Sequence, residues 1–251
     1  MLYARVRELL VRECIFFAQC SSGGQVLRPP GVTASIVPAA PLRSMFNWVI
    51  FDHLDALAVH YSTLAAAYDA AGVRAWTVWV DPGDQAACDI LTDRGHVLDS
   101  QPAAMAAEMG DLKLPPVEDL DWSETRDLDL IGRINDAAYG FPPPAFAAVM
   151  QRWPESPWHA YVARLNDEPV ATVMTHNGSD GDCGVTAVAT LPVARGHGIA
   201  GRLLAAALGA ARAGGAVTTS LQASPTGKRV YAALGYRDLG TMGMWERRDE
   251  N

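Results

Sequence analysis

ARGHGIAG, residues 194–201, joins a run rich in β-branched residues to a long stretch of alanine and leucine, so we expect a strand to give way to a helix within it. The first N–H groups of a helix have no partner in the helix, and with the helix dipole they form a site for an anion. Gly196, Gly198 and Gly201 let the backbone turn so that these groups converge, and Arg195 adds positive charge. We therefore predict that the segment binds a phosphate or pyrophosphate.

Two well-known phosphate motifs do not account for this segment. A P-loop needs Lys followed by Ser or Thr after its second glycine, whereas Arg202 and Leu203 follow Gly201. The dinucleotide fingerprint GxGxxG is present, but it belongs after the first strand of a βαβ unit, with an acidic residue about 20 positions later. Here the preceding strands form a meander and residues 213–224 contain no Asp or Glu, which disfavours a nicotinamide or flavin cofactor.

The residues around this segment predict an α+β unit. Residues 126–140 have helical spacing and end at Gly140 before three prolines, and a short second helix is expected in 145–153. Three β-branched runs separated by turn residues predict an antiparallel meander. The expected order from the meander onward is strands 158–165, 168–176 and 183–191, helix 199–215, strand 216–224, helix 227–235, and strands at 236–239 and 243–247.

Two motifs resemble the GCN5-related N-acetyltransferase family. Its pyrophosphate loop has the form Arg/Gln-x-x-Gly-x-Gly/Ala, which residues 195–200, RGHGIA, match at every fixed position. Downstream, SPTGKRVYAALGY (224–236) is similar to the family's second signature, which ends Tyr-x-x-Leu-Gly-Tyr/Phe and often has Asn where this chain has Ser224. The resemblance covers residues 118–247 and implies a layered α/β/α fold with a mixed central sheet.

The resemblance also implies residue roles. Backbone N–H groups of Arg195, Gly196, His197, Gly198, Ile199, Ala200 and Gly201 would hold the pyrophosphate of coenzyme A. The backbone of Val188, Ala189 and Thr190 would pair with the pantetheine arm, beside a bulge that opens the sheet, and Ser224 would bond to the same arm. Tyr231, with an ordinary pKa of about 10, would protonate the leaving thiolate. A tyrosine on an amphipathic helix is also commonly a packed core residue, so that alternative stays open.

The implied reaction is attack of a neutral amine on the thioester of acetyl-CoA, without a metal, with the oxyanion held by a backbone N–H near Val188. Residues 185–190 lack the Glu that many relatives use as base. Asp182, Glu155 and His176 are weak candidates beside a water chain to a backbone carbonyl. Four aromatic residues either line the acceptor pocket or belong to the core: Tyr139, Phe141, Trp153 and Trp158.

The first half has a weaker pattern. The double proline and acidic residues of 110–122 indicate a connector, so we expect domains at 1–115 and 116–251.

An offset of 140 residues places Gly95 over Gly235 and gives both halves the same order of strand, helix and strand, which indicates either a diverged duplication or a chance match between α/β segments. The offset also places Asp55 over Arg195 and Leu91 over Tyr231. A carboxylate near a helix N-terminus caps the helix and repels an anion. We therefore expect a degenerate N-terminal copy that supports the active half or shapes its acceptor cleft, as in some tandem relatives.

Composition limits the partners. The net charge of −8 argues against nucleic-acid and anionic-membrane surfaces. The four cysteines lack CxxC spacing, which argues against a zinc site or disulfide framework, and no run approaches the roughly 20 apolar residues of a membrane span. We expect a cytoplasmic monomer or homodimer that acetylates a small-molecule or peptide amine; an alcohol acceptor or a longer acyl chain stays open. The alternative is a non-catalytic acyl-CoA sensor or scaffold.

Overall fold

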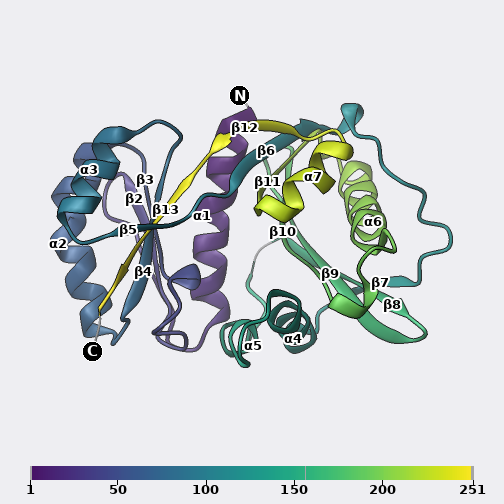
Figure 1. The fold of residues 1–251 in the computed structure, drawn as a ribbon, viewed down its shortest axis with the longest axis horizontal. Coiled ribbons are helices and arrows are strands. Elements are labelled where there is room, and N and C mark those ends of the chain that lie inside the picture. The colour runs from purple at the N-terminus through teal and green to yellow at the C-terminus, as the bar shows by residue number, and fades with distance from the viewer. Residues whose placement is uncertain (1, 156, 250–251) are drawn as a thin grey trace. The chain divides into compact units, whose positions relative to one another are not determined.

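The computed structural model describes residues 2–155 and 157–249 as two compact units, each built around one sheet (Figure 1). We call them the N-terminal and C-terminal units. The N-terminal unit contains residues Leu10–Pro102, Ala148–Arg152 and 240–249. The C-terminal unit contains residues 2–9, Ala103–Ala147 and Trp153–Leu239.

The N-terminal unit has a six-stranded sheet in the order β1-β2-β3-β4-β13-β5. Its elements are β1 (Gln25–Leu27), β2 (Val32–Ile36), the 3-10 turn η1 (Ser44–Phe46), β3 (Trp48–Phe51), α2 (Leu54–Ala70), β4 (Ala75–Val80), α3 (Gln85–Asp93), β5 (Val97–Ser100) and β13 (Gly243–Arg248). Helix α1 (Leu2–Cys20) begins in the residues of the C-terminal unit and ends in this one. Helices α2 and α3 lie on one side of strands β2 to β4 and α1 on the other (Figure 1).

The C-terminal unit has a seven-stranded sheet in the order β12-β6-β11-β10-β9-β8-β7. Its elements are β6 (Ala103–Glu108), the 3-10 turn η2 (Met109–Asp111), β7 (Trp122–Thr125), α4 (Leu128–Tyr139), α5 (Phe146–Val149), β8 (Trp158–Leu165), β9 (Glu168–Asn177), β10 (Asp182–Thr190), the 3-10 turn η3 (Pro192–Ala194), α6 (Ile199–Ala213), β11 (Thr218–Ala223), α7 (Pro225–Ala233) and β12 (Arg237–Thr241).

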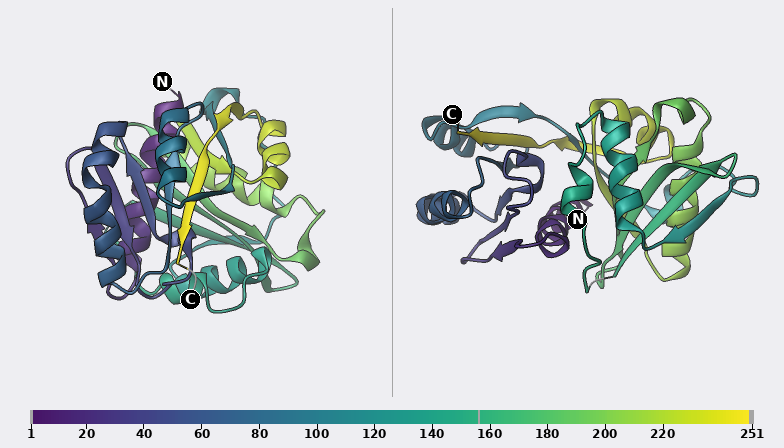
Figure 2. Two further views of the ribbon diagram at one scale, coloured as in Figure 1. Left: turned by 60° about the vertical axis from the view of Figure 1, so that its left-hand side comes forward. Right: turned by 90° about the horizontal axis from the view of Figure 1, so that it is seen from below.

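Successive residues of β8 show how helices cover both faces of this sheet. Tyr161 and Ala163 belong to the core cluster that includes the buried leucines of α6. Val162, between them, packs with Ile134 of α4 instead. Because side chains alternate between the faces of a strand, α6 and α4 cover opposite faces. The two views of Figure 2 show helices on both faces of each sheet, so the expected α/β/α layering is confirmed.

The six strands β5-β13-β4-β3-β2-β1 of one sheet correspond in order to β12-β6-β11-β10-β9-β8 of the other, whose edge strand β7 has no counterpart. Strands β13 and β6 occupy matching places, although each comes from the opposite half of the sequence. In each sheet two parallel strands are joined by a helix, β3-α2-β4 in one and β10-α6-β11 in the other. Strand β13, the last of the chain, pairs antiparallel with β4 and β5, whereas β6 lies between β11 and β12. Figure 1 shows yellow β13 among the strands of the first half and teal β6 beside β11. Strands β6 and β13, and helices α3 and α7, begin and end 140 residues apart, as the offset predicted.

Two details differ from the sequence-based prediction. The compact units do not divide at a single point near residue 115. Hydrogen bonding places residues 103–108 beside β11, from Ala103↔Ala223 to Glu108↔Thr218, and it places β13 beside β4. The second short helix, expected in 145–153, covers only Phe146–Val149.

Candidate functional site

The segment that precedes α6 has the backbone conformation that its glycines predicted. Gly196 has a φ of 82° and Gly198 a φ of 70°, and Gly198 is the N-cap of α6. A Cβ at either position would meet nothing within 4 Å. These glycines are therefore required by their left-handed backbone angles and not by lack of space.

The N–H groups at the start of α6 are available to a ligand. Among the described residues, none accepts a hydrogen bond from the N–H groups of residues 196–201, and no side chain caps the helix. Only the Arg195 N–H is used, by the Pro192 carbonyl at 3.3 Å. The first turn of α6 carries no acidic residue. This end of the helix thus combines unpaired donors with the positive end of the helix dipole.

The two charged or titratable side chains of the loop do not point their polar atoms at the helix start. The Arg195 guanidinium donates to the carbonyls of Thr190 and Ala138, so it ties the end of β10 to α4. His197 is exposed, and its Nδ1 lies 2.9 Å from the Arg195 carbonyl. The expected role of the Arg195 N–H as a pyrophosphate donor is not supported, because that N–H already donates to the Pro192 carbonyl. The role of the His197 N–H stays a prediction.

Strand β10 separates from β11 after three paired positions. The parallel pairing runs from Asp182↔Thr218 to Gly184↔Ser220. On its other edge β10 stays paired with β9, but the register slips between Thr186 and Ala189. Two residues of β10, Ala187 and Val188, lie opposite the single Val173 of β9, which is a β-bulge. It contains Val188, the first of the three residues expected to hold pantetheine.

Side chains satisfy the carbonyls of the bulge. The Thr172 hydroxyl donates to the Ala187 carbonyl at 3.1 Å, and the Tyr139 hydroxyl donates to the Val188 carbonyl at 3.1 Å. Asn135 Nδ2 donates to Thr172 Oγ1 at 3.1 Å and to the Ile131 carbonyl at 2.8 Å. Asn135 and Thr172 are buried, and Asn135 Oδ1 has no partner among the described residues, which costs about 1–3 kcal/mol.

Sequence reasoning missed the roles of Asn135, Thr172 and Ala187. A polar residue within a helical or strand pattern carries no local signal of the bulge that it contacts. Tyr139 was expected either in the acceptor pocket or in the core, and not as a donor to the bulge.

Tyr231 is a buried phenol on α7. It is 9% exposed, and its ring meets Tyr236 edge-on at 5.7 Å. Burial raises the pKa of Tyr231 well above its ordinary value, and the neighbouring Tyr139 raises it further. The phenol is therefore protonated at neutral pH, and its hydroxyl has no hydrogen-bond partner within residues 2–155 and 157–249. The first property means that the phenol holds a proton it could give, although a raised pKa also makes it a weaker acid than a free tyrosine.

Ser224 is the N-cap of α7. Its Oγ accepts from the Gly227 N–H at 3.2 Å, which leaves the hydroxyl hydrogen for another acceptor. The role expected for Ser224 toward pantetheine stays a prediction.

The three weak base candidates lie in different surroundings. Asp182 is fully buried at the paired end of β10, where its oxygens accept from Thr218 at 2.7 Å and Ser220 at 2.6 Å. Glu155 is an exposed loop residue. His176 is buried on β9, with its ring 4.8 Å from that of Trp158. The structural hydrogen bonds of Asp182 argue against it as the base.

The four aromatic residues weighed for the acceptor pocket do not form one group. Tyr139 and Phe141 pack with Phe146, at ring distances of 6.0 to 6.1 Å. Trp153 lies under the Arg126 guanidinium, and Trp158 packs on His176.

The corresponding place in the N-terminal unit lacks these features. His53, and not Asp55 as the sequence suggested, caps α2, because its Nδ1 accepts from the Ala56 N–H at 3.2 Å. Asp55 lies in the first turn. Leu91, which the offset places over Tyr231, is fully buried. At the start of α2 a side chain of the protein therefore already accepts a hydrogen bond from one of the N–H groups, and Asp55 places a negative charge beside them.

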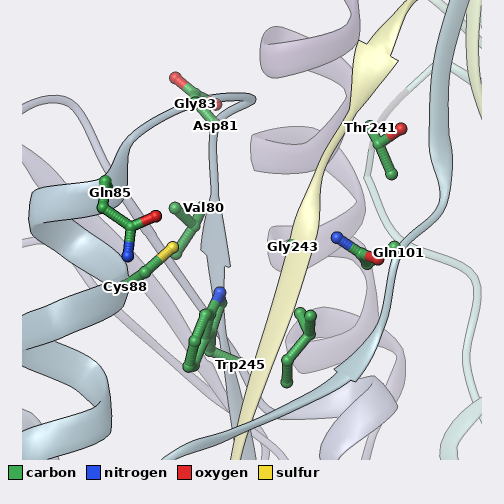
Figure 3. Close-up of a pocket in the computed structure, with 10 residues that line it drawn as sticks. Val80, Asp81, Gly83, Gln85, Cys88, Gln101, Thr241, Gly243 and Trp245 are labelled. Atoms are coloured by element: carbon green, nitrogen blue, oxygen red, sulfur yellow. The ribbon is translucent and has the colours of Figure 1, made fainter.

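The N-terminal unit has a separate cavity of about 310 Å³ at the end of β4 (Figure 3). Gln85 and Cys88 approach it from α3, and Trp245 from β13. The remaining lining residues are Val80, Asp81, Gly83, Leu98, Gln101, Thr241 and Gly243. It contains no glycine-rich helix start and no tyrosine, so it is not a second copy of the α6 site. Burial raises the pKa of the Cys88 thiol, which keeps it neutral.

Neither a metal centre nor a membrane span stands out in the part of the chain that the structure describes. No group of three or more His, Cys, Asp or Glu side chains there is arranged to hold a metal ion. None of the described helices is long and apolar enough to cross a bilayer.

Comparisons with known proteins agree with this geometry. Residues 117–236 match the acetyltransferase (GNAT) family. A GCN5-related N-acetyltransferase from Kribbella flavida superposes with a TM-score of 0.70 at 18% identity, over 98% of this chain and 96% of that one. A functionally unknown conserved protein from Staphylococcus epidermidis ATCC 12228 gives 0.65 at 16% identity, over 95% and 100%. A tandem GNAT protein from the clavulanic acid biosynthesis pathway gives 0.57 at 10% identity, over 99% and 96%.

At these identities the structural matches show a shared fold and nothing about acceptors. No curated protein is significantly similar in sequence. The family match coincides with the bulged strand, the glycine-rich helix start and Tyr231. Over residues 117–236 the chain therefore matches the acetyltransferase (GNAT) family in sequence, and its fold matches that of GCN5-related N-acetyltransferases.

Proposed function

We propose that this protein is an acyl-CoA-dependent N-acetyltransferase with its active site in residues 116–251. The observation that carries the proposal is the set of unpaired N–H groups at residues 196–201, which follow a strand that has separated from its neighbour. Together they provide an anion site beside an open strand edge. A pyrophosphate joined to an extended amide-containing arm, as in coenzyme A, fits both.

The donor would be held by backbone groups. The N–H groups of residues 196–201 bind the pyrophosphate. The dipole of α6 adds a partial positive charge at the same end of the helix. The unpaired edge of β10 at Val188, Ala189 and Thr190 takes the pantetheine arm as a short added strand. Ser224 donates its hydroxyl hydrogen to the same arm.

The chemistry uses proximity and one proton donor. The nitrogen lone pair of a neutral amine forms the C–N bond, the C–S bond breaks, and the sulfur takes the proton of Tyr231. A backbone N–H near Val188 stabilises the oxyanion. The acceptor ammonium and then the attacking nitrogen each release a proton to bulk solvent through a water chain that a backbone carbonyl orients, because the carboxylate of Asp182 is already engaged. Tyr231 regains its proton from solvent after the thiol has left.

Residues 1–115, which supply most of the N-terminal unit, form a degenerate copy that binds no second donor. His53 caps its corresponding helix and Asp55 adds a negative charge there. We therefore expect one coenzyme A per chain.

Calorimetric titration with acetyl-CoA, followed by a turnover assay on a panel of amines, tests the proposal. We expect one binding site, turnover of at least one amine, and a loss of at least tenfold in kcat for Tyr231→Phe with acetyl-CoA binding retained. Tyr161→Phe is the matched control, because Tyr161 is also buried and its pKa is also raised by burial, to about 12, but it packs against Trp122. Binding without turnover of any amine would support a sensor or scaffold instead. Absence of binding would refute both.

A further inference from the structure

The bulge in β10 depends on a backbone conformation that its sequence disfavours. Ala187 has a φ of 48°, in the left-handed region that residues with a Cβ seldom adopt. Only two other described residues besides glycine have a positive φ, Asn166 and Asp167, and they form a turn between β8 and β9. A strained alanine inside a strand persists only where its surroundings hold it.

The contacts that hold it come from neighbouring elements. Thr172, 1% exposed on β9, donates its single hydroxyl hydrogen to the Ala187 carbonyl. Asn135 of α4, fully buried, donates to the same hydroxyl oxygen and so orients that hydrogen. Asn135 is fixed in turn by its bond to the Ile131 carbonyl. The three groups form a chain from α4 through β9 to the bulge.

We propose that Thr172, oriented by Asn135, is a positioning residue for acyl transfer: it holds Ala187 in the left-handed conformation and thereby aims the backbone of Val188 at the reacting carbonyl. This proposal rests on the proposed function. Without the hydroxyl, the partly buried Ala187 carbonyl loses its partner, and the bulge relaxes toward a regular register. A one-residue change of register in a strand reverses the side to which each group points. The oxyanion donor would then be misaligned, whereas the pyrophosphate amides at 196–201 would be unaffected.

The first test is Thr172→Val, which removes the hydroxyl and keeps the shape. We expect kcat to fall at least tenfold, the KM for acetyl-CoA to stay within about threefold, and amide hydrogen exchange in residues 185–191 to accelerate at least tenfold. Thr172→Ser keeps the hydroxyl and should retain kcat within about threefold. Thr219→Val is the matched control: Thr219 is a buried threonine that donates to the Cys183 carbonyl at 2.8 Å, where β10 is still paired with β11. It should lower the melting temperature with little change in kcat.

The second test is rescue by Ala187→Gly in the Thr172→Val background. Glycine adopts a positive φ without strain, so the double variant should recover most of the lost kcat and of the exchange protection. A merely structural role of the Thr172 hydroxyl predicts no such recovery. If Thr172→Val leaves both kcat and hydrogen exchange at the bulge unchanged, the proposal is wrong. If the double variant is no better than Thr172→Val, the proposal is also wrong.

The readouts separate this proposal from the proposed function. A wild-type protein that turns over no amine refutes the proposed function, and hydrogen exchange at residues 185–191 still measures whether Thr172 holds the bulge. An active wild-type protein with an unaffected Thr172→Val variant refutes only the positioning role.

Discussion

Helices α2 and α6 occupy matching places in the two units but differ in what their first N–H groups do. Each connects two parallel strands of its sheet. At α2 the His53 side chain accepts from the Ala56 N–H, and Asp55 places a negative charge in the first turn. At α6 the N-cap is Gly198, which has no side chain to offer, and the first turn has no acidic residue.

The strands before these helices also differ, and again the difference leaves more backbone groups for a ligand in the C-terminal unit. Strand β3 has four residues and pairs regularly with β2 and β4, whereas β10 has nine residues, a bulge and an edge that β11 leaves after Gly184. A shared position in the fold therefore does not give a shared binding capacity. The residue before the helix and the register of the strand decide whether donors remain for a ligand.

The largest effect is expected from Gly198→Val. A β-branched residue is strongly disfavoured at a φ of 70°, so the loop would change conformation and its N–H groups would diverge. Loss of two hydrogen bonds to a charged pyrophosphate, at about 1.5–3 kcal/mol each, should weaken coenzyme A binding by at least about 100-fold. Isothermal titration calorimetry measures this.

Gly72→Val is its control in the other half. Gly72 has a φ of 71° just after α2, and a Cβ there also meets nothing within 4 Å. The backbone penalty is thus the same, and unfolding should become easier while coenzyme A binding is unchanged. Equal loss of binding in both variants would show that general destabilisation, and not the α6 loop, explains the result.

The sequence predicted most of the C-terminal unit. The meander, the helices after it and the glycine conformations at 196 and 198 follow from strong local patterns. The offset of 140 residues also predicted matching elements in the first half, such as α3 and α7.

What escaped prediction depends on contacts between residues that are distant in the sequence. Nothing near Ala187 indicates a positive φ, because Thr172 and Asn135 impose it. The exchange of β6 and β13 is set by pairing with β11 and β4, and not by their own composition. His53 was missed as a cap because Asp55, a residue type that commonly caps helices, stands two positions later.

The next effect concerns acid stability, which should differ between the units. In the N-terminal unit His96 Nε2 accepts from the Tyr61 hydroxyl at 2.8 Å, and its Nδ1 donates to the Trp245 carbonyl at 3.0 Å. Both bonds fit the neutral ring, and burial lowers the pKa of His96 to about 4. The offset of 140 places Tyr236 at the corresponding position, where its hydroxyl bonds to Thr219 at 2.9 Å.

Because the unfolded chain protonates His96 near pH 6.5, this group's contribution is fully present above that pH and is lost as the pH falls toward 4. The loss amounts to at most about 3 kcal/mol. Urea unfolding between pH 7 and pH 4 should show it, and His96→Gln should flatten the pH dependence. His60→Gln, on α2, is the control and should leave the slope in place. An unchanged slope in His96→Gln would assign the acid sensitivity elsewhere.

The smallest effects are expected at the caps of α7 and α3, which the offset places at corresponding positions. Ser224 Oγ accepts from the Gly227 N–H, and Asp84 Oδ1 accepts from the Ala87 N–H at 3.0 Å. Ser224→Ala and Asp84→Ala should each lower the free energy of unfolding by about 1 kcal/mol, because each helix loses its N-cap. Chemical denaturation measures both.

Binding separates these two variants. If Ser224 also donates to pantetheine, Ser224→Ala should weaken acetyl-CoA binding about three- to tenfold, the effect of one neutral hydrogen bond. Asp84→Ala removes the same kind of cap in the unit that we expect to bind no donor, so its affinity should match that of the wild type. A Ser224→Ala variant with wild-type affinity would leave Ser224 as a helix cap alone. A loss of affinity in Asp84→Ala would mean that the N-terminal unit contributes to donor binding after all.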